Sequence, residues 1–192
     1  MKPAERLALA ISRIGHPLVF VMISVAVVAV QIAPARAVTI LSTLFLAVIA
    51  PTAVLLIAGV RTGRWQDADV SVRAERKRFY PWAILIAAFG TAVTWATGAP
   101  LFIVRGALVT LALFMAAALV NARLKISLHT LFAAYCTIIL TRISWGYGIA
   151  ALVLAGFVFW SRIFLGRHNL AEACAGLALG ALGGLFAVYW PT

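Results

Sequence analysis

Long apolar runs alternate with short polar segments along the whole chain. Each apolar run holds few charged residues and approaches the roughly 20 residues that an α-helix needs to cross a bilayer. Two runs, 127–143 and 147–160, are near the lower limit for a crossing. The pattern therefore predicts an all-α fold, a polytopic membrane helical bundle of six or seven transmembrane helices. The predicted spans are 17–34, 38–60, 81–98, 101–120, 127–143, 147–160 and 168–189.

Residues 1–16 differ from the spans because they are polar and amphipathic. We expect them to form an interfacial N-terminal segment ahead of a membrane anchor, rather than a cleaved signal. No linker or repeat divides the chain, so we expect a single membrane-embedded domain over residues 1–192. Small residues predominate over 171–184, which indicates that the last helix packs closely against a neighbour.

The composition also indicates a membrane location. Of the 192 residues, 65% are hydrophobic and 11% are charged, and the mean hydropathy is +1.07. A soluble domain of this size has too small an interior to bury so much apolar surface. Cys136 and Cys174 lie inside apolar runs, and two cysteines are too few for a disulfide framework. We expect an integral membrane protein with reduced cysteines.

Sixteen Lys and Arg residues outnumber five Asp and Glu residues, which gives a net charge of +11. The basic residues lie in connections between apolar runs, without the interleaved aromatic residues that stack bases, so no nucleic-acid partner is expected. If two spans separate each pair of successive polar segments, most basic residues fall on one side, which the positive-inside rule makes cytoplasmic. The small size and the Ala- and Arg-rich composition indicate a bacterial inner membrane.

A charged stretch, 161–172, lies between the last two apolar runs. His168 and Glu172 are four residues apart, so in a helix they lie about 5–6 Å apart on one face. A carboxylate there accepts a hydrogen bond from one imidazole nitrogen and makes the other available as a base or nucleophile. Arg162 and Arg167 flank the pair, and planar guanidinium groups bind oxyanions such as phosphate. The alternative is a positive-inside loop that contains a histidine by chance.

Three polar segments, 69–81, 125–130 and 161–172, are predicted on the same side of the membrane. Together they hold two histidines, His129 and His168, a paired carboxylate and an excess of Lys and Arg. This inventory fits phosphoryl transfer, in which cations bind the phosphate, one histidine attacks it and the other acts as general acid. A metal site is the main alternative, but it needs three or four convergent ligands and is disfavoured by cationic surroundings. We therefore expect neither a metal nor another cofactor.

The same segments resemble the three signatures of the type 2 phosphatidic acid phosphatase (PAP2) superfamily. Residues 161–172 read Ser-Arg-x5-His-x3-Glu where the third signature has Ser-Arg-x5-His-x3-Asp. Residues 126–129 read Ile-Ser-Leu-His where the second has Pro-Ser-Gly-His, and the basic run before Pro81 resembles the first, Lys-x6-Arg-Pro. The motif region 69–172 covers more than half of the chain in the family's order. The resemblance implies a PAP2-like helical core.

The resemblance also implies a role for each matched residue. His168 would attack the phosphorus and form a phosphohistidine, Glu172 would orient it, and His129 would protonate the leaving group. Water would then release phosphate without a metal. The phosphate oxygens would be bound by side chains from all three signatures: Arg162, Ser127, Lys125, Arg73, Arg76 and Arg78.

The residue that corresponds to the arginine of the first signature is not fixed by the sequence. In the Lys-x6-Arg-Pro register, Arg73 takes the place of the lysine and Tyr80 that of the arginine before Pro81. Either Arg78 or Arg76 is then expected to take the arginine's role.

These expectations define an integral-membrane lipid phosphatase that acts on a lipid phosphate or diphosphate, of the isoprenoid diphosphate or phosphatidate type. Its partner would be a membrane lipid with a phosphate headgroup. Two alternatives stay open. A lipid phosphotransferase would use the same intermediate but pass the phosphate to another acceptor, and a non-catalytic protein would bind or transport anionic lipids.

Overall fold

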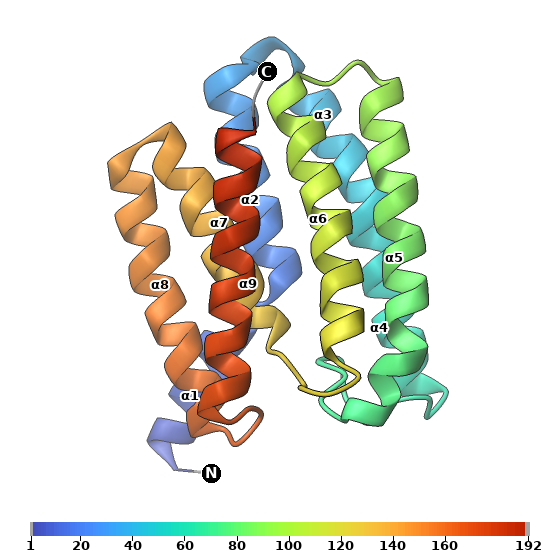
Figure 1. Cartoon of the computed structure of the whole chain (residues 1–192), viewed down its shortest axis with the longest axis vertical. Coiled ribbons are helices and arrows are strands. Elements are labelled where there is room, and N and C mark those ends of the chain that lie inside the picture. The colour runs from blue at the N-terminus through green and yellow to red at the C-terminus, as the bar shows by residue number, and fades with distance from the viewer. Residues whose placement is uncertain (1, 191–192) are drawn as a thin grey trace. The chain divides into compact units, whose positions relative to one another are not determined.

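The computed structural model describes residues 2–190, and all regular structure among them is helical (Figure 1). The predicted all-α fold is therefore confirmed. A 3₁₀ turn, Pro34–Arg36, precedes α3, and a π-helical segment, Phe45–Ile49, joins α3 to α4. The α-helices are α1 (Pro3–Ile14), α2 (Pro17–Ile32), α3 (Ala37–Leu44), α4 (Ala50–Arg61), α5 (Arg73–Ala96), α6 (Leu101–Val120), α7 (Leu128–Ile143), α8 (Trp145–Phe164) and α9 (Leu170–Tyr189).

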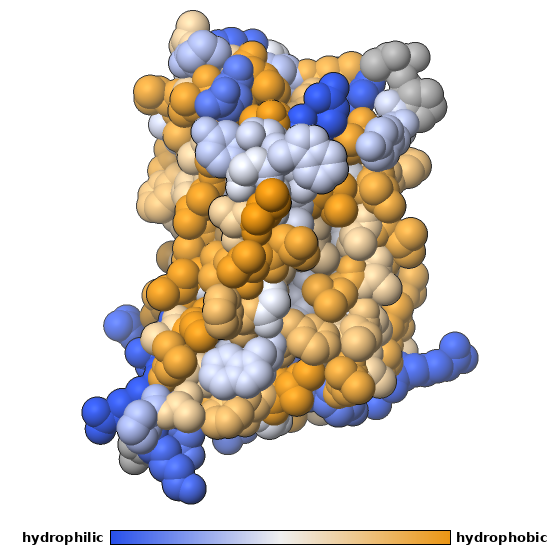
Figure 2. Space-filling model, turned by 90° about the vertical axis from the view of Figure 1, so that its left-hand side faces the viewer, coloured by the Kyte–Doolittle hydropathy of each residue, from blue (hydrophilic) through white to orange (hydrophobic). Residues whose placement is uncertain are grey.

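Helices of membrane-crossing length and hydropathy account for most of the fold. Helices α1 and α2 add a sixth candidate span if they are taken together as one crossing bent by 50°. Helix α7 is apolar but has only 16 residues. Figure 2 shows one face, on which hydrophobic side chains cover the middle and hydrophilic side chains gather toward the ends. The fold is that of a polytopic helical membrane protein, and its five other candidate spans are Pro34–Arg61, Arg73–Ala96, Leu101–Val120, Trp145–Phe164 and Leu170–Tyr189.

One predicted boundary is wrong. The sequence pattern places a polar connection over 61–80, but α5 begins at Arg73, so the basic residues before Pro81 are helical. An apolar pattern stops at the membrane surface, whereas the hydrogen bonds of a helix continue into water. Pro81 removes one N–H from α5, and it is tolerated because the carbonyl four residues earlier belongs to the exposed Lys77.

The helices group into two compact units, which are described separately. Of the described residues, unit 1 comprises 2–32 and 126–190 and contains α1, α2, α7, α8 and α9. Unit 2 comprises 33–125 and contains α3 to α6. The first signature therefore lies in unit 2, and the third signature lies in unit 1.

Helix α7 is the centre of unit 1 and contacts α2, α8 and α9. Most of its side chains are buried, so it does not need the length of a lipid-facing span. Helix α9 comes close to α7 at three glycines that leave no room for a side chain. A Cβ added at Gly180 would lie 2.0 Å from the carbonyl oxygen of Leu131, and Gly176 and Gly184 are also close to α7. The close packing predicted from the small residues of 171–184 is confirmed.

Helix α1 packs against α8 through a narrow face. Ala8 and Ser12 are buried, whereas Arg13 is exposed. The turn after α1 is equally close to α8, since a Cβ at Gly15 would lie 2.1 Å from Cγ2 of Val158. The amphipathic N-terminal segment is thus a helix with one face held by the rest of unit 1.

In unit 2, α5 packs against α3, α4 and α6. The π-helical segment Phe45–Ile49 comes just before Pro51, whose ring and missing N–H exclude a regular α-helical bond at this point. Helix α5 accommodates this segment at Gly90, where a Cβ would lie 2.2 Å from Cγ2 of Val48.

The loop between α4 and α5 is held by its own side chains. Trp65 is buried, and its Nε1 donates to the carbonyl of Leu56 at 3.1 Å. The carboxylate of Asp67 accepts hydrogen bonds from the backbone N–H groups of Asp69 (3.0 Å) and Ser71 (3.2 Å). These bonds order the segment that leads into the basic first turns of α5.

Candidate active site

The start of α9 holds His168 through Glu172. Asn169 caps the helix by accepting a hydrogen bond from the N–H of Glu172 (2.9 Å), and Oε2 of Glu172 accepts one from the N–H of Asn169 (3.2 Å). The same Oε2 lies 3.0 Å from Nδ1 of His168. The predicted contact is therefore present, but the predicted helical start at His168 is wrong, because α9 begins at Leu170 and His168 lies just before its N-cap. The helix cap fixes the carboxylate that makes the contact.

This contact assigns the roles of the two ring nitrogens of His168. An ionised carboxylate only accepts hydrogen bonds, so the Nδ1 of a neutral His168 bound to it carries the proton. The lone pair is then on Nε2, which is the atom able to attack phosphorus or take a proton. The His168 side chain has 0% exposed surface, against 14% for Glu172. A ligand would therefore reach Nε2 only if the surroundings of this ring opened.

The connection from α8 to α9 brings Arg162 close to the backbone of His168. The carbonyl of Arg162 accepts hydrogen bonds from the N–H groups of Arg167 (3.1 Å) and His168 (3.2 Å). This tight return uses Gly166, whose φ of +65° favours glycine. Arg162 itself is buried, and its Nη1 donates to Oγ of Ser12 at 2.6 Å. A buried and fixed guanidinium is suited to binding an oxyanion.

Hydrogen bonds join the start of α7 to the first turn of α9. The N–H of Ser127 donates to the carbonyl of Glu172 (3.2 Å), and Oγ1 of Thr130 donates to the carbonyl of Ala173 (3.0 Å). Ser127 also caps α7, because its Oγ accepts from the N–H of Thr130 at 3.4 Å. His129 lies between Ser127 and Thr130, so it is held at the same end of unit 1 as the start of α9.

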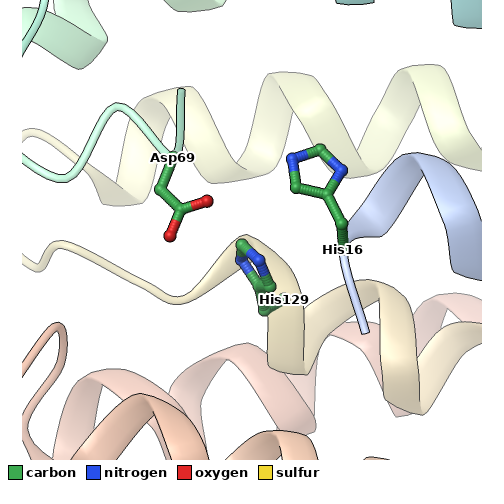
Figure 3. A group of neighbouring side chains, drawn as sticks. All are labelled: His16, Asp69 and His129. Atoms are coloured by element: carbon green, nitrogen blue, oxygen red, sulfur yellow. The ribbon is translucent and has the colours of Figure 1, made fainter. Parts of the chain in front are cut away.

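His16 also belongs to this group, although the sequence pattern indicates only an interfacial residue. It lies at the turn between α1 and α2, and its ring meets that of His129 edge to face, with centroids 5.3 Å apart and planes at 85° (Figure 3). Asp69, the third residue drawn in Figure 3, belongs to unit 2. Ser12, the partner of Arg162, lies in the last turn of α1, four residues before His16. The available sequence signals were a His-Pro pair at the start of an apolar run and the Ser-x3-His spacing.

The first-signature cations lie in unit 2, and two of them bind backbone carbonyls. Arg73 donates through Nε to the carbonyl of Asn121 (2.9 Å) and through Nη2 to that of Ala122, so it ties the start of α5 to the end of α6. Arg76 is only 2% exposed, and its Nε donates to the carbonyl of Val70 at 2.9 Å.

The carbonyl that holds Arg76 belongs to a strained residue. Val70 has a φ of +46°, a left-handed conformation that β-branched residues rarely adopt. Lys125 donates from Nζ to the carbonyl of Ser71 at 3.3 Å, and Arg78 is exposed. Arg76 is therefore the most deeply buried of these four basic side chains of unit 2.

Replacing Arg73 with Gln is expected to lower the free energy of unfolding by about 1–2 kcal/mol, because two carbonyls at the end of α6 lose a charged donor. Unfolding in detergent measures the loss. Arg78→Gln is the matched control, since it removes the same charge from an exposed position of the same helix and should cost less than about 0.5 kcal/mol. Equal losses in the two variants would contradict this structural role of Arg73.

In unit 1 the structure thus gathers a buried histidine paired with a carboxylate, a second histidine and a buried arginine. This set is able to bind an oxyanion, attack it and move a proton. No protein-family model, curated protein or solved structure matches the chain. The resemblance to the PAP2 superfamily therefore depends on the three short motifs.

Proposed function

We propose that the chain is an integral-membrane lipid phosphatase and a divergent relative of the PAP2 superfamily. It hydrolyses a lipid phosphate or diphosphate through a phosphohistidine on His168, without a metal. The observation that carries the proposal is the 3.0 Å contact between Nδ1 of His168 and Oε2 of Glu172, in a part of unit 1 that also holds Arg162 and His129. A histidine whose Nδ1 is bound by a carboxylate has its lone pair on Nε2, which makes it a nucleophile.

In the first step, Nε2 of His168 attacks phosphorus. The N–P bond forms as the P–O bond to the leaving group breaks, the electron pair stays on the leaving oxygen, and His129 gives that oxygen a proton. Glu172 accepts a hydrogen bond from the Nδ1–H and stabilises the positive charge of the phosphorylated ring. Arg162 binds the phosphate oxygens, on which negative charge is concentrated.

In the second step, water attacks phosphorus and gives a proton to His129. The N–P bond breaks, its electron pair returns to Nε2 of His168, and inorganic phosphate leaves. His129 thereby recovers the proton that it gave in the first step, so the site returns to its starting state without consuming a cofactor.

A lipid substrate is favoured because the basic residues adjoin long, lipid-facing apolar helices. Isoprenoid diphosphates and phosphatidate-type lipids are the two classes that we propose. Arg76 is our first candidate for further phosphate binding, because it is buried and its Nε is held by the carbonyl of Val70. The other proposed phosphate ligands are Ser127, Lys125, Arg73 and Arg78.

The proposed location is the bacterial inner membrane, with the site on the cytoplasmic side. The support is the distribution of charge: the polar segments 1–16, 61–80, 121–126 and 161–168 carry most of the Lys and Arg residues. Lipids made by cytosolic enzymes, such as isoprenyl diphosphates, would reach this side directly.

The test is phosphate release by the detergent-purified protein in EDTA. The lipid panel contains isoprenyl diphosphates and monophosphates, phosphatidate and phosphatidylglycerophosphate. We expect release that survives the chelator and that is absent from the His168→Ala protein, with the preferred lipid identifying the substrate class. A wild-type rate no higher than that of the variant on every lipid would overturn the proposal.

The same assay separates the two alternatives. Phosphate that appears on an added alcohol at the expense of free phosphate would indicate a phosphotransferase with the same intermediate. Equal binding of anionic lipids by the wild type and the His168→Ala variant, without turnover, would indicate a non-catalytic lipid-binding or transport protein.

A further inference from the structure

His16 and His129 come from distant parts of the sequence and meet because α2 packs against α7. Their ring centroids are 5.3 Å apart, and a ring nitrogen of each lies within 4.8 Å of one of the other (Figure 3). At any separation up to this bound, one oxygen atom is able to contact both rings. Two hydrogen bonds of about 2.8 Å that converge on one oxygen atom span a distance that this bound allows.

The tautomer of His16 is set by the start of α2. Nδ1 of His16 accepts a hydrogen bond from the N–H of Leu18 at 3.2 Å and so caps the first turn of this helix. A nitrogen that accepts a hydrogen bond carries no proton, so the proton of the neutral ring is on Nε2. His16 in this state is an N–H donor, and its protonated form would lose the cap.

The turn that carries His16 is fixed at two further points. Ser12 accepts the hydrogen bond from Nη1 of Arg162 at 2.6 Å. Gly15 packs so closely that a Cβ there would lie 2.1 Å from Cγ2 of Val158. The turn is therefore held against both the arginine and the second histidine of the candidate site.

We propose that His16 is a further catalytic residue, whose Nε2–H donates a hydrogen bond to the leaving oxygen beside His129. The inference rests on the proposed phosphatase function. The hydrogen bond stabilises the negative charge that develops on this oxygen as the P–O bond breaks. It also holds the oxygen within reach of the proton of His129.

The proton count stays balanced. His129 gives its proton to the leaving oxygen in the first step and recovers one from water in the second. His16 keeps its Nε2 proton throughout and orients the attacking water by the same hydrogen bond, while its Nδ1 stays bound to the N–H of Leu18.

A purely structural role for His16, as the cap of α2, is the alternative. The variant His16→Asn separates the two roles. Asn is among the most favoured N-cap residues, so the cap is kept while the ring donor beside His129 is lost. His16→Ala removes both and reports their sum.

The experiment compares two leaving groups in single-turnover reactions. One substrate is a long-chain alkyl phosphate, whose alkoxide leaves poorly without a proton; the other is a nitrophenyl phosphate with the same alkyl chain, whose phenolate is stable. We expect His16→Asn to slow release from the alkyl phosphate by about 10-fold or more and from the nitrophenyl phosphate by less than about twofold. Thermal unfolding in detergent should match the wild type.

Ser12→Ala is the matched variant from the same turn. It removes the partner of Arg162, which acts on the phosphate and not on the leaving oxygen, so it is expected to slow both substrates equally. Equal slowing of both substrates by His16→Asn, or slowing of neither, overturns the proposal and leaves the phosphatase function standing. If the wild type releases neither leaving group faster than His168→Ala, the proposed function and this inference fail together.

Discussion

The His168→Ala protein is expected to release lipid phosphate about 10⁴-fold more slowly than the wild type, or slower still. The reason is that Nε2 of His168 is the proposed attacking atom, and the contact of Glu172 with Nδ1 leaves the lone pair on this nitrogen. The variant should still fold, because Glu172 and Asn169 keep their reciprocal helix cap without the imidazole. Thermal unfolding in detergent checks this point.

A covalent intermediate gives the same prediction a direct readout. With a substrate labelled at phosphorus, quenched wild-type protein should carry label that is stable in alkali and lost in acid, as expected of an N–P bond. The label should be absent from His168→Ala. Label that persists in this variant, or that survives acid as a phosphate ester does, would contradict the assignment of His168.

His129→Ala provides the contrasting control. Because His129 is the proposed base of the second step, its removal should slow hydrolysis of the intermediate more than its formation from a nitrophenyl phosphate, which needs no proton on the leaving group. The labelled intermediate should therefore accumulate in His129→Ala. Loss of the label in both histidine variants would mean that His129 acts before the N–P bond forms.

The helices were predictable from the sequence because lipid imposes a simple requirement. Each crossing needs a long run without charges, and such runs are visible without knowledge of tertiary contacts. The start of α5 at Arg73 was not predictable in this way, since the part of a helix beyond the lipid has no apolar pattern. What stabilises that end is the pairing of Arg73 with carbonyls of α6, which only the fold brings together.

In the candidate site, too, local contacts were predictable from the sequence and contacts between distant segments were not. The contact between His168 and Glu172 was predictable because it is local, and the sequence Asn-x-x-Glu at 169–172 also signals the helix cap that fixes the carboxylate. The meeting of His16 with His129 depends on the packing of α2 against α7, more than a hundred residues apart in the chain. No spacing rule predicts such a contact.

The helix cap also gives a physical reason for Glu172 where the PAP2 signature has aspartate. Oε2 of Glu172 contacts both the N–H of Asn169 and Nδ1 of His168. A glutamate at the third helical position is the residue type that reaches back to the N-cap backbone in a capping box. The longer side chain thus combines the orientation of the histidine with the start of the helix.

Helix α9, which carries Glu172, packs closely against α7 at Gly180. We therefore expect Gly180→Ala to be strongly destabilising. Its Cβ would lie 2.0 Å from the carbonyl oxygen of Leu131 and 2.8 Å from the carbonyl carbon, and a backbone cannot rotate away as a flexible side chain can. The two helices would have to separate, at a cost of about 3 kcal/mol in the free energy of unfolding. Thermal unfolding in detergent and the fraction of monodisperse protein measure this loss.

Gly156→Ala is the matched control for Gly180→Ala, because both residues lie inside helices of unit 1 and a Cβ at Gly156 meets nothing within 4 Å. There the higher helix propensity of alanine should stabilise the protein by up to about 1 kcal/mol. Separation of α9 from α7 would also stretch the bond between the N–H of Ser127 and the carbonyl of Glu172, so Gly180→Ala should lose phosphate release along with stability. If Gly180→Ala unfolds at the wild-type temperature, α9 does not approach α7 as closely as the contacts of Gly180 require.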